Sequence, residues 1–151
     1  MPRLSSSPHG SRGFTLLELA TVLLLLSFSL GSLLPAARRQ LDRMAVLGAR
    51  EEVVGLFHRA RLEAVAFGSA TLHLESGTAS ATLFAGGEVV GHAALMDEYG
   101  VTLTLSRGRS EADLTFDPLG LGRVASQTLR FYRGEAEAGL VVSSFGRVVR
   151  E

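Results

Sequence analysis

The 151-residue chain contains neither lysine nor cysteine, so all 15 of its basic residues are arginines. Without a lysine amine there is no P-loop of the usual kind, no Schiff base and no Ser-Lys dyad. Without cysteine there is no disulfide, no thiolate nucleophile and no zinc ribbon, and cysteine usage does not indicate a redox compartment. These absences exclude several classes of enzyme and metal protein.

Net charge is also absent, because 15 acidic side chains match the 15 arginines. The chain therefore lacks the broad positive field that drives nonspecific binding to nucleic acid. Its length suits one domain of ordinary size plus an anchoring segment.

Motifs for catalysis, metal binding and cofactor binding are missing as well. No Gly-x-Ser-x-Gly elbow is present to position a serine nucleophile. Gly120-x-Gly122 follows Asp-Pro in a strand-like region, which favours a hairpin turn over a dinucleotide site. Neither His-x-x-x-His nor His-Glu-x-x-His occurs among the four histidines, His9, His58, His73 and His92. We therefore expect no enzyme, no metal site and no cofactor.

The N-terminal region consists of two segments of opposite character. Residues 1–13 are polar and slightly basic, as in an unstructured leader. Residues 14–34 are nearly all apolar or small, and as a helix they would extend about 30 Å, the thickness of a bilayer core. The run is too long for the core of a conventional signal peptide, and no small-x-small cleavage site follows it. We expect it to remain on the protein and to span a membrane.

The rest of the chain changes from a helical to a strand-like period. Residues 35–68 predict an amphipathic helix ending near Phe67, with an apolar stripe at Val53, Leu56, Phe57, Ala60, Ala64 and Phe67. From Ala70 onward the period is two, which predicts half-buried strands at 71–75, 81–84, 101–105 and 128–132. Breaks at 76–77, 86–87, 100, 107–108, 117–120 and 139 have the spacing of antiparallel hairpins. The prediction is an α+β fold: one long N-terminal helix, first hydrophobic and then amphipathic, packed on a C-terminal antiparallel β-sheet globule over residues 69–151.

Glu18 is the one charge in the apolar run. A carboxylate at the centre of a bilayer costs about 2.5 to 3.5 kcal/mol, and less near a helix end, so it usually has a partner or a function. The simpler interpretation is an interfacial glutamate at the start of a helix, where the helix dipole favours negative charge.

The surrounding sequence, Gly13-Phe14-Thr15-Leu16-Leu17-Glu18, resembles the type III signal of type IV prepilins and type II secretion pseudopilins. The resemblance implies that a membrane prepilin peptidase cuts after Gly13 and methylates the new N-terminal amine of Phe14. Pro35 then falls where pilins often carry a helix-kinking proline. Glu18 would pair with the N-terminal amine of a neighbouring subunit, which would fix the register of assembly because an unpaired carboxylate in an apolar filament core is costly.

A second resemblance covers later segments. Ala60-Arg61-Leu62-Glu63-Ala64-Val65 followed by Gly68 is similar to the helix end in minor pseudopilins of the GspH/FimT group. The stretches 116–120 and 141–148 are similar to that group's closing strands, in which a Ser-x-x-Gly-Arg turn precedes the last short strand.

The resemblances imply a minor pseudopilin of a type II secretion system, held in the bacterial inner membrane by residues 14–34 with its globule in the periplasm. Its partners would be the prepilin peptidase, other subunits of the filament and the inner-membrane assembly platform. A minor pilin of a type IV pilus is the first alternative. A signal-anchored periplasmic binding or enzymatic domain is the alternative of another class.

Arginines crowd the last 30 or so residues, and several of them would bind phosphates if they converged on one face. DNA is therefore a further candidate partner, as for some FimT-like minor pilins, although a solvated face balanced by Glu135, Glu137 and Glu151 is favoured. The arginines concerned are Arg123, Arg130, Arg133, Arg147 and Arg150.

Overall fold

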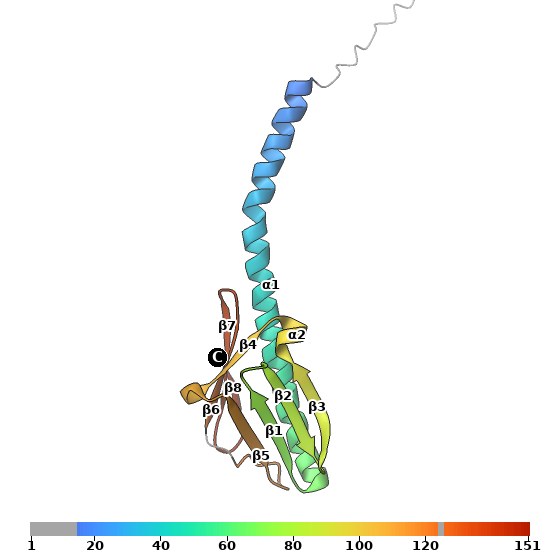
Figure 1. The fold of residues 1–151 in the computed structure, drawn as a ribbon, viewed down its shortest axis with the longest axis vertical. Helices are drawn as coiled ribbons and strands as arrows, with labels where there is room; N and C mark the ends of the chain where they lie inside the picture. The colour runs from blue at the N-terminus through green and yellow to red at the C-terminus, as the bar shows by residue number, and fades with distance from the viewer. Residues whose placement is uncertain (1–14, 124–125) are drawn as a thin grey trace, which may run out of the picture. The chain divides into compact units, whose positions relative to one another are not determined.

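A computed structural model describes residues 15–123 and 126–151, with only the backbone at positions 32 and 33. The described residues form a long helix, α1 (Leu16–Phe67), a short helix, α2 (Leu95–Tyr99), and the strands drawn in Figure 1. The chain divides into two compact units, residues 1–37 and 38–151, and α1 contributes to both.

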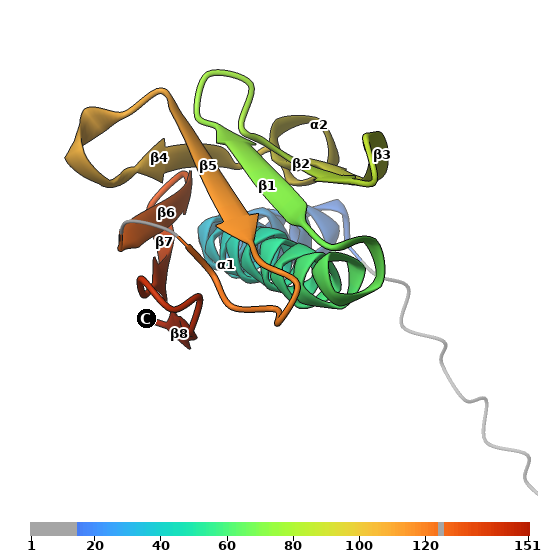
Figure 2. The same ribbon diagram turned by 90° about the horizontal axis from the view of Figure 1, so that it is seen from below.

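The second unit carries two antiparallel sheets. The first has the order β3-β2-β1-β5 and the second the order β4-β6-β7-β8. The strands are β1 (Ala70–Glu75), β2 (Ser80–Ala85), β3 (Glu88–Ala94), β4 (Thr102–Leu105), β5 (Glu111–Phe116), β6 (Gln127–Arg133), β7 (Ala136–Val142) and β8 (Val148–Arg150). Figure 2 shows the first sheet over the C-terminal half of α1 and β6, β7 and β8 beside it. The predicted α+β class is confirmed, with its strands divided between two sheets.

The core lies between α1 and these sheets. Alternate residues of β1, β2 and β5 are buried, as a period of two requires for sheets covered on one face. Phe57 of α1 meets Phe116 of β5 edge to face, with ring centroids 6.2 Å apart and planes at 78°. The buried residues of α1 recur at helical spacing: Val46, Ala49, Val53, Val54, Leu56, Phe57, Ala60 and Ala64.

The predicted end of the helix is confirmed, although one stripe residue was misplaced. α1 ends at Phe67, and Gly68 follows in the left-handed region with φ of +85°, which is typical of a glycine C-cap. Phe67 itself is exposed. Its ring lies beside Gly86 in the β2–β3 turn, and a glycine turn is too small to cover it.

Glycines with positive φ form the β2–β3 and β6–β7 hairpin turns. Gly86 and Gly87 connect β2 to β3 with φ of +59° and +85°, the type I′ requirement, so the break predicted there is confirmed. The break predicted at Gly139 is wrong, because Gly139 pairs with Arg130 inside β7. The turn lies instead at Gly134 and Glu135, where Gly134 has φ of +57°. A Cβ added at position 139 would lie 3.0 Å from the Glu151 Cβ, so a larger residue there would crowd Glu151.

Strand β3 and helix α2 show no clear hydrophobic period in the sequence. Strand β3 contains Gly91, where an added Cβ would lie 2.9 Å from Leu56 Cδ2 of α1. The β2–β3 pairing also shifts register between Leu83 and Phe84, as at a β-bulge. Helix α2 is a single turn whose Gly100 caps it with left-handed geometry, so the break predicted at Gly100 ends a helix.

Candidate functional site

The start of α1 carries the motif singled out in the sequence. Gly13 and Phe14, the predicted cleavage and methylation positions, lie outside the described residues. Thr15 Oγ1 accepts a hydrogen bond of 3.2 Å from the Glu18 backbone N–H. Thr15 thus occupies the N-cap position and Glu18 the N3 position, with the carboxylate in the first turn where the helix dipole favours it. The local geometry agrees with the simpler interpretation of Glu18 and leaves its carboxylate exposed.

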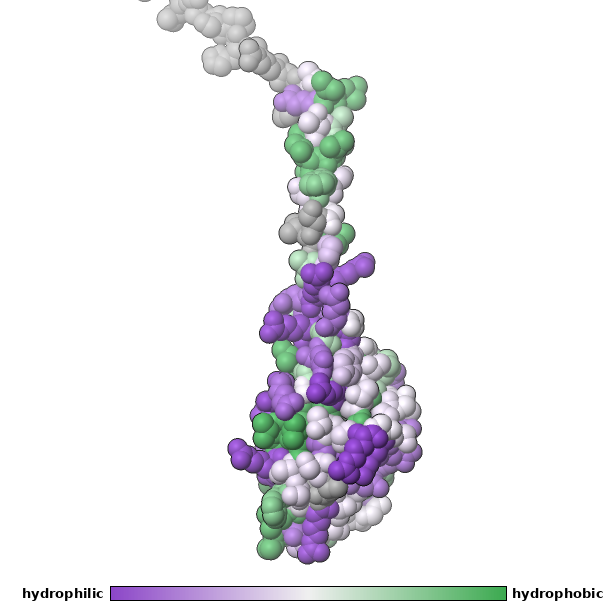
Figure 3. All heavy atoms as spheres, turned by 90° about the vertical axis from the view of Figure 1, so that its left-hand side faces the viewer, coloured by the Kyte–Doolittle hydropathy of each residue, from purple (hydrophilic) through white to green (hydrophobic). Residues whose placement is uncertain are grey.

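The first part of α1 is apolar and exposed. Leu16 is 87% exposed and Phe28 77%, and Figure 3 shows this stretch as largely hydrophobic surface. The hydroxyls of Thr21, Ser27 and Ser29 donate to the backbone carbonyls four residues earlier, at 2.8, 2.8 and 2.9 Å. Such bonds satisfy polar groups without water. α1 is therefore long and apolar enough to cross a membrane, by length and composition.

Pro35 lies inside α1, which continues through it. Proline has no N–H, so the Gly31 carbonyl loses its usual helical donor. The structure places Pro35 within the helix, and its role in assembly stays a prediction.

Three of the four arginines proposed for phosphate contact are engaged in ion pairs. Arg130 on β6 pairs with Glu137 on β7, which raises the Arg130 pKa through that hydrogen bond. Arg133 pairs with Asp42 of α1 at 2.9 Å and also donates to the Tyr99 carbonyl. Arg147 and Arg150 line one hollow together, whereas Arg130 lines a different one.

Asp42 also lines a hollow of about 510 Å³. It is open and charged, and an ion pair of 3.4 Å between Arg39 and Glu135 also lies there. Both partners of that pair are largely exposed, so the pair contributes little to stability.

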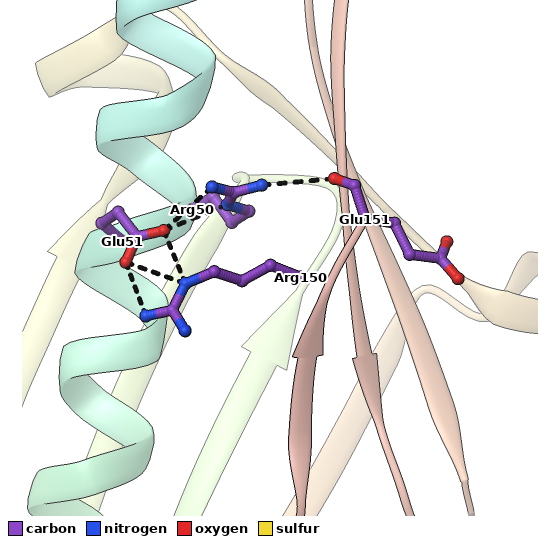
Figure 4. A network of polar contacts seen from close by, with 4 residues as sticks. All are labelled: Arg50, Glu51, Arg150 and Glu151. Atoms are coloured by element: carbon purple, nitrogen blue, oxygen red, sulfur yellow. Dashed lines mark hydrogen bonds and ion pairs between the residues drawn. The ribbon is translucent and has the colours of Figure 1, made fainter.

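Arg150 of β8 forms an ion pair with Glu51 of α1 (Figure 4). Its guanidinium donates to both carboxylate oxygens of Glu51, at 2.9 and 2.8 Å, in a bidentate pair. Arg50 donates to the same carboxylate at 3.0 Å and to the Glu151 main-chain oxygen at 3.2 Å. The hydrogen bond from Arg150, with the one from Arg50, lowers the Glu51 pKa to about 2.

Two turns similar to the closing segment of the GspH/FimT group meet beside this strand. Asp117 Oδ1 accepts from the backbone N–H groups of Leu119 and Leu121, both at 2.9 Å. Ser143 Oγ accepts from the Arg147 N–H at 3.1 Å, and the Ser143 carbonyl accepts from the Gly146 N–H at 2.8 Å. Both turns are thus held by their own polar side chains.

The two turns touch through glycines. A Cβ added at Gly122 would lie 2.8 Å from the Gly146 Cα, a distance that real side chains do not adopt. Gly146 has φ of +76°, and an added Cβ there would lie 3.3 Å from Phe116 Cε1. The backbone crossing therefore requires glycine at both positions.

A groove of about 370 Å³ lies between α1 and the second turn. Four of its lining residues are cationic or titratable, and four are apolar. They are His58, Arg61, Arg147 and Arg150, with Val54, Phe57, Phe145 and Val148. We call this the C-terminal groove.

Arg61 is the functional candidate that sequence reasoning missed. One of its terminal nitrogens donates to the Gly146 carbonyl, and its Nε is buried without a hydrogen-bond partner among residues 15–123 and 126–151. Its position four residues after Phe57 and one after Ala60 places a cation at the edge of the buried stripe, and that is the signal that identifies it.

No group of three or more His, Asp or Glu side chains within the described residues is arranged to hold a metal ion. His73 Nδ1 lies 2.7 Å from Asp113 Oδ1, and His92 Nδ1 lies 2.9 Å from Thr82 Oγ1. Each of these pairs is a cross-strand contact on the first sheet, since the residues are in register.

These features define the class of the protein: an α+β chain whose long N-terminal helix is apolar and exposed in its first part and forms the core of an antiparallel globule in its second. A solved structure of the Pseudomonas aeruginosa PAO1 type IV minor pilin FimU is similar, with a TM-score of 0.56 and 18% sequence identity. The match covers 73% of this chain and 90% of that chain, so the fold is pilin-like. A scan against protein-family models and a search of curated proteins find no match.

Proposed function

We propose that the protein is a minor structural subunit of a pilin-like filament machine in the bacterial inner membrane. The observation that carries this proposal is the single continuous helix α1, which combines an exposed apolar stretch with a half that is buried in an antiparallel globule. FimU, which has a similar fold, is itself described as a type IV minor pilin.

Residues 14–34 would hold the processed subunit in the membrane until assembly. The helix then moves from lipid into the filament core, where the helices of neighbouring subunits replace the acyl chains. Little hydrophobic free energy is lost, because the helix stays in an apolar environment.

Glu18 would select the register of each incoming subunit. Its backbone N–H already bonds to Thr15, and the described residues provide no cationic partner for its exposed carboxylate. The amine of Phe14, released by cleavage after Gly13, would supply that partner from a neighbouring chain. Burial of the pair in a low-dielectric core penalises any register that leaves either charge unpaired.

Replacement of Glu18 tests this function. We expect Glu18→Ala to be inserted and processed normally but to be lost from the purified filament fraction of cells that carry the assembly machine. The matched control is Glu88→Ala, which removes an exposed carboxylate from the β2–β3 hairpin and should be incorporated like the wild type. Equal incorporation of Glu18→Ala and wild type would contradict the proposed role.

Two machines fit this subunit. A type II secretion pseudopilus is the first, because the resemblance to the GspH/FimT group covers the helix end and both closing turns. A type IV pilus is the second, because the structurally similar FimU is a minor pilin. Deletion of the gene distinguishes them: loss of secreted enzymes from the medium supports secretion, and loss of surface pili supports the pilus.

DNA binding through Arg130, Arg133, Arg147 and Arg150 remains a prediction of lower rank. Three of these four guanidiniums are already in ion pairs with Glu137, Asp42 and Glu51. Affinity for DNA grows with the number of phosphates that a protein neutralises, so paired arginines contribute less to it.

A further inference from the structure

The C-terminal groove contains cationic groups that the fold itself does not use. Arg61 Nε is buried and has no hydrogen-bond partner in the described part of the chain. A buried donor without a partner costs about 1 to 3 kcal/mol. The Arg61 side chain as a whole is only half-buried and lines the groove, so an anion that arrived there would offset part of this cost. The Arg147 side chain is exposed at the same groove and makes no ion pair within the described ranges.

Apolar surface lies directly beside these cations. Phe145 is 76% exposed at the edge of the groove, although its neighbour Gly146 is buried. Phe57 and Val54 of α1 line the same hollow. Aromatic residues and arginine are both enriched at protein–protein interfaces relative to the rest of the surface.

We infer that the C-terminal groove binds an acidic segment of another subunit of the filament, with a carboxylate between Arg61 and Arg147 and an adjacent apolar side chain against Phe145. This inference rests on the proposed function, because it takes the partner to be a fellow subunit. Arg150 takes part indirectly: its bidentate pair with Glu51 holds β8 against α1 and so fixes the wall of the groove that carries Arg147.

Charge and size favour a protein carboxylate over nucleic acid. Only Arg61 and Arg147 among the lining arginines are without an ion pair in the described residues, since Arg150 is committed to Glu51. Two cations match one carboxylate in a charge-assisted contact but neutralise few phosphates of a polymer. A hollow of about 370 Å³, at the lower end of the range for ligand clefts, suits a few side chains.

The first test uses the full-length chain in detergent micelles and two fluorescein-labelled peptides. One peptide alternates leucine and glutamate, and the other has glutamine in place of every glutamate. We expect fluorescence anisotropy to show binding of the acidic peptide only, and the Arg147→Glu variant to weaken it by about ten-fold or more. Arg109→Glu is the matched control, because Arg109 is also exposed but lies near the β4–β5 turn, and it should change binding by less than about two-fold.

A second variant tests Arg61, the less exposed of the two groove cations. Arg61→Gln keeps an amide near the Gly146 carbonyl but removes the charge, and tyrosine fluorescence during urea unfolding checks that the globule still folds. We expect a folded Arg61→Gln to lose the acidic peptide as well. The inference is overturned if both arginine variants bind the acidic peptide like the wild type, if the glutamine peptide binds equally well, or if only a DNA oligonucleotide binds and does so through Arg147.

Cross-linking in cells separates this inference from the proposed function. A photo-reactive residue at position 145 should capture another filament subunit at a peptide that contains Asp or Glu, and Arg147→Glu should abolish the capture. If the protein still enters filaments and position 145 captures no subunit, the groove assignment fails and the proposed function stands. If the chain enters no filament at all, the proposed function fails whatever the peptide result.

Discussion

Gly122 gives the sharpest test of how the two closing turns are packed. Its φ is not in the left-handed region, so alanine can adopt the backbone conformation without intrinsic strain. The added Cβ would nevertheless lie 2.8 Å from the Gly146 Cα and 2.9 Å from the Gly146 nitrogen. Both neighbours are backbone atoms, so rotation of a side chain cannot relieve the contact. The Ser143–Arg147 turn must move as a unit.

Forced movement of well-packed backbone typically costs about 1 to 3 kcal/mol, and we expect Gly122→Ala to destabilise the globule by that amount. Gly55→Ala is the matched control, because Gly55 lies on the exposed side of α1 with no atom within 4 Å of an added Cβ. Alanine in a helix interior is favoured over glycine by about 0.5 to 1 kcal/mol, so the same substitution there should stabilise the chain. The two variants therefore predict opposite signs.

Tyrosine fluorescence offers a selective assay. The chain has no tryptophan and two tyrosines, Tyr99 and Tyr132, both in the second unit, so the signal reports on the globule and not on the apolar part of α1. Urea unfolding of the full chain in detergent gives the free energy of unfolding for each variant. A Gly122→Ala globule as stable as the wild type would refute the close crossing of the two turns, and a destabilised Gly55→Ala would refute the exposure of that helix face.

Two pH effects follow from single contacts. Tyr99 donates to Glu52 Oε2 at 2.6 Å, and this hydrogen bond, with burial, raises the Tyr99 pKa to about 12. Glu52→Gln should lower that pKa toward its ordinary value of 10, as measured by the ultraviolet absorbance of tyrosinate, and an unchanged titration would argue against the contact. Arg150 and Arg50 lower the Glu51 pKa to about 2 from an ordinary value of 4.5, so the Glu51 contribution to stability is present above about 4.5 and is lost as the pH falls toward 2. Arg150→Gln should reduce this acid dependence of the unfolding midpoint, by a small amount because the pair is exposed to solvent, and acid unfolding identical to the wild type would contradict the pairing.

Much of the fold was predictable because local patterns and tertiary packing agree. The helical stripe from Val53 to Ala64 is buried as its spacing requires, and the strands predicted at 71–75 and 81–84 lie within one residue of β1 and β2. The glycine pair at 86–87 identified a hairpin because only that turn type needs positive φ at two successive residues.

The elements that escaped prediction are those in which a distant contact overrides the local pattern. Gly91 interrupts the apolar sequence of β3 because Leu56 of α1 approaches it closely. Gly139 indicates a turn but lies in a paired strand, where the C-terminal residue Glu151 crowds it. Leu56 and Glu151 are distant in sequence from the glycines they contact, so the local hydrophobic pattern could not predict these contacts.

In the candidate site, too, local features were predictable from the sequence and contacts between distant segments were not. Glu18 was recognisable because a charge in an apolar run is unusual, and its capping bond with Thr15 is a local contact. The ion pairs of Arg133 and Arg150 were not predictable, because their acidic partners, Asp42 and Glu51, come from α1 far upstream. The position of Arg61 beside the buried stripe is visible in the sequence, but its contact with the Gly146 carbonyl is not, because Gly146 lies far downstream.

Processing of the leader is tested by the intact mass and N-terminal sequence of the membrane-extracted protein, with and without a co-expressed prepilin peptidase. Wild-type protein should begin at N-methylated Phe14 only when the peptidase is present, and Gly13→Ala should remain uncut. A chain that keeps residues 1–13 in the presence of the peptidase, or one cut beyond Leu34 by another enzyme, would contradict the account of a filament subunit.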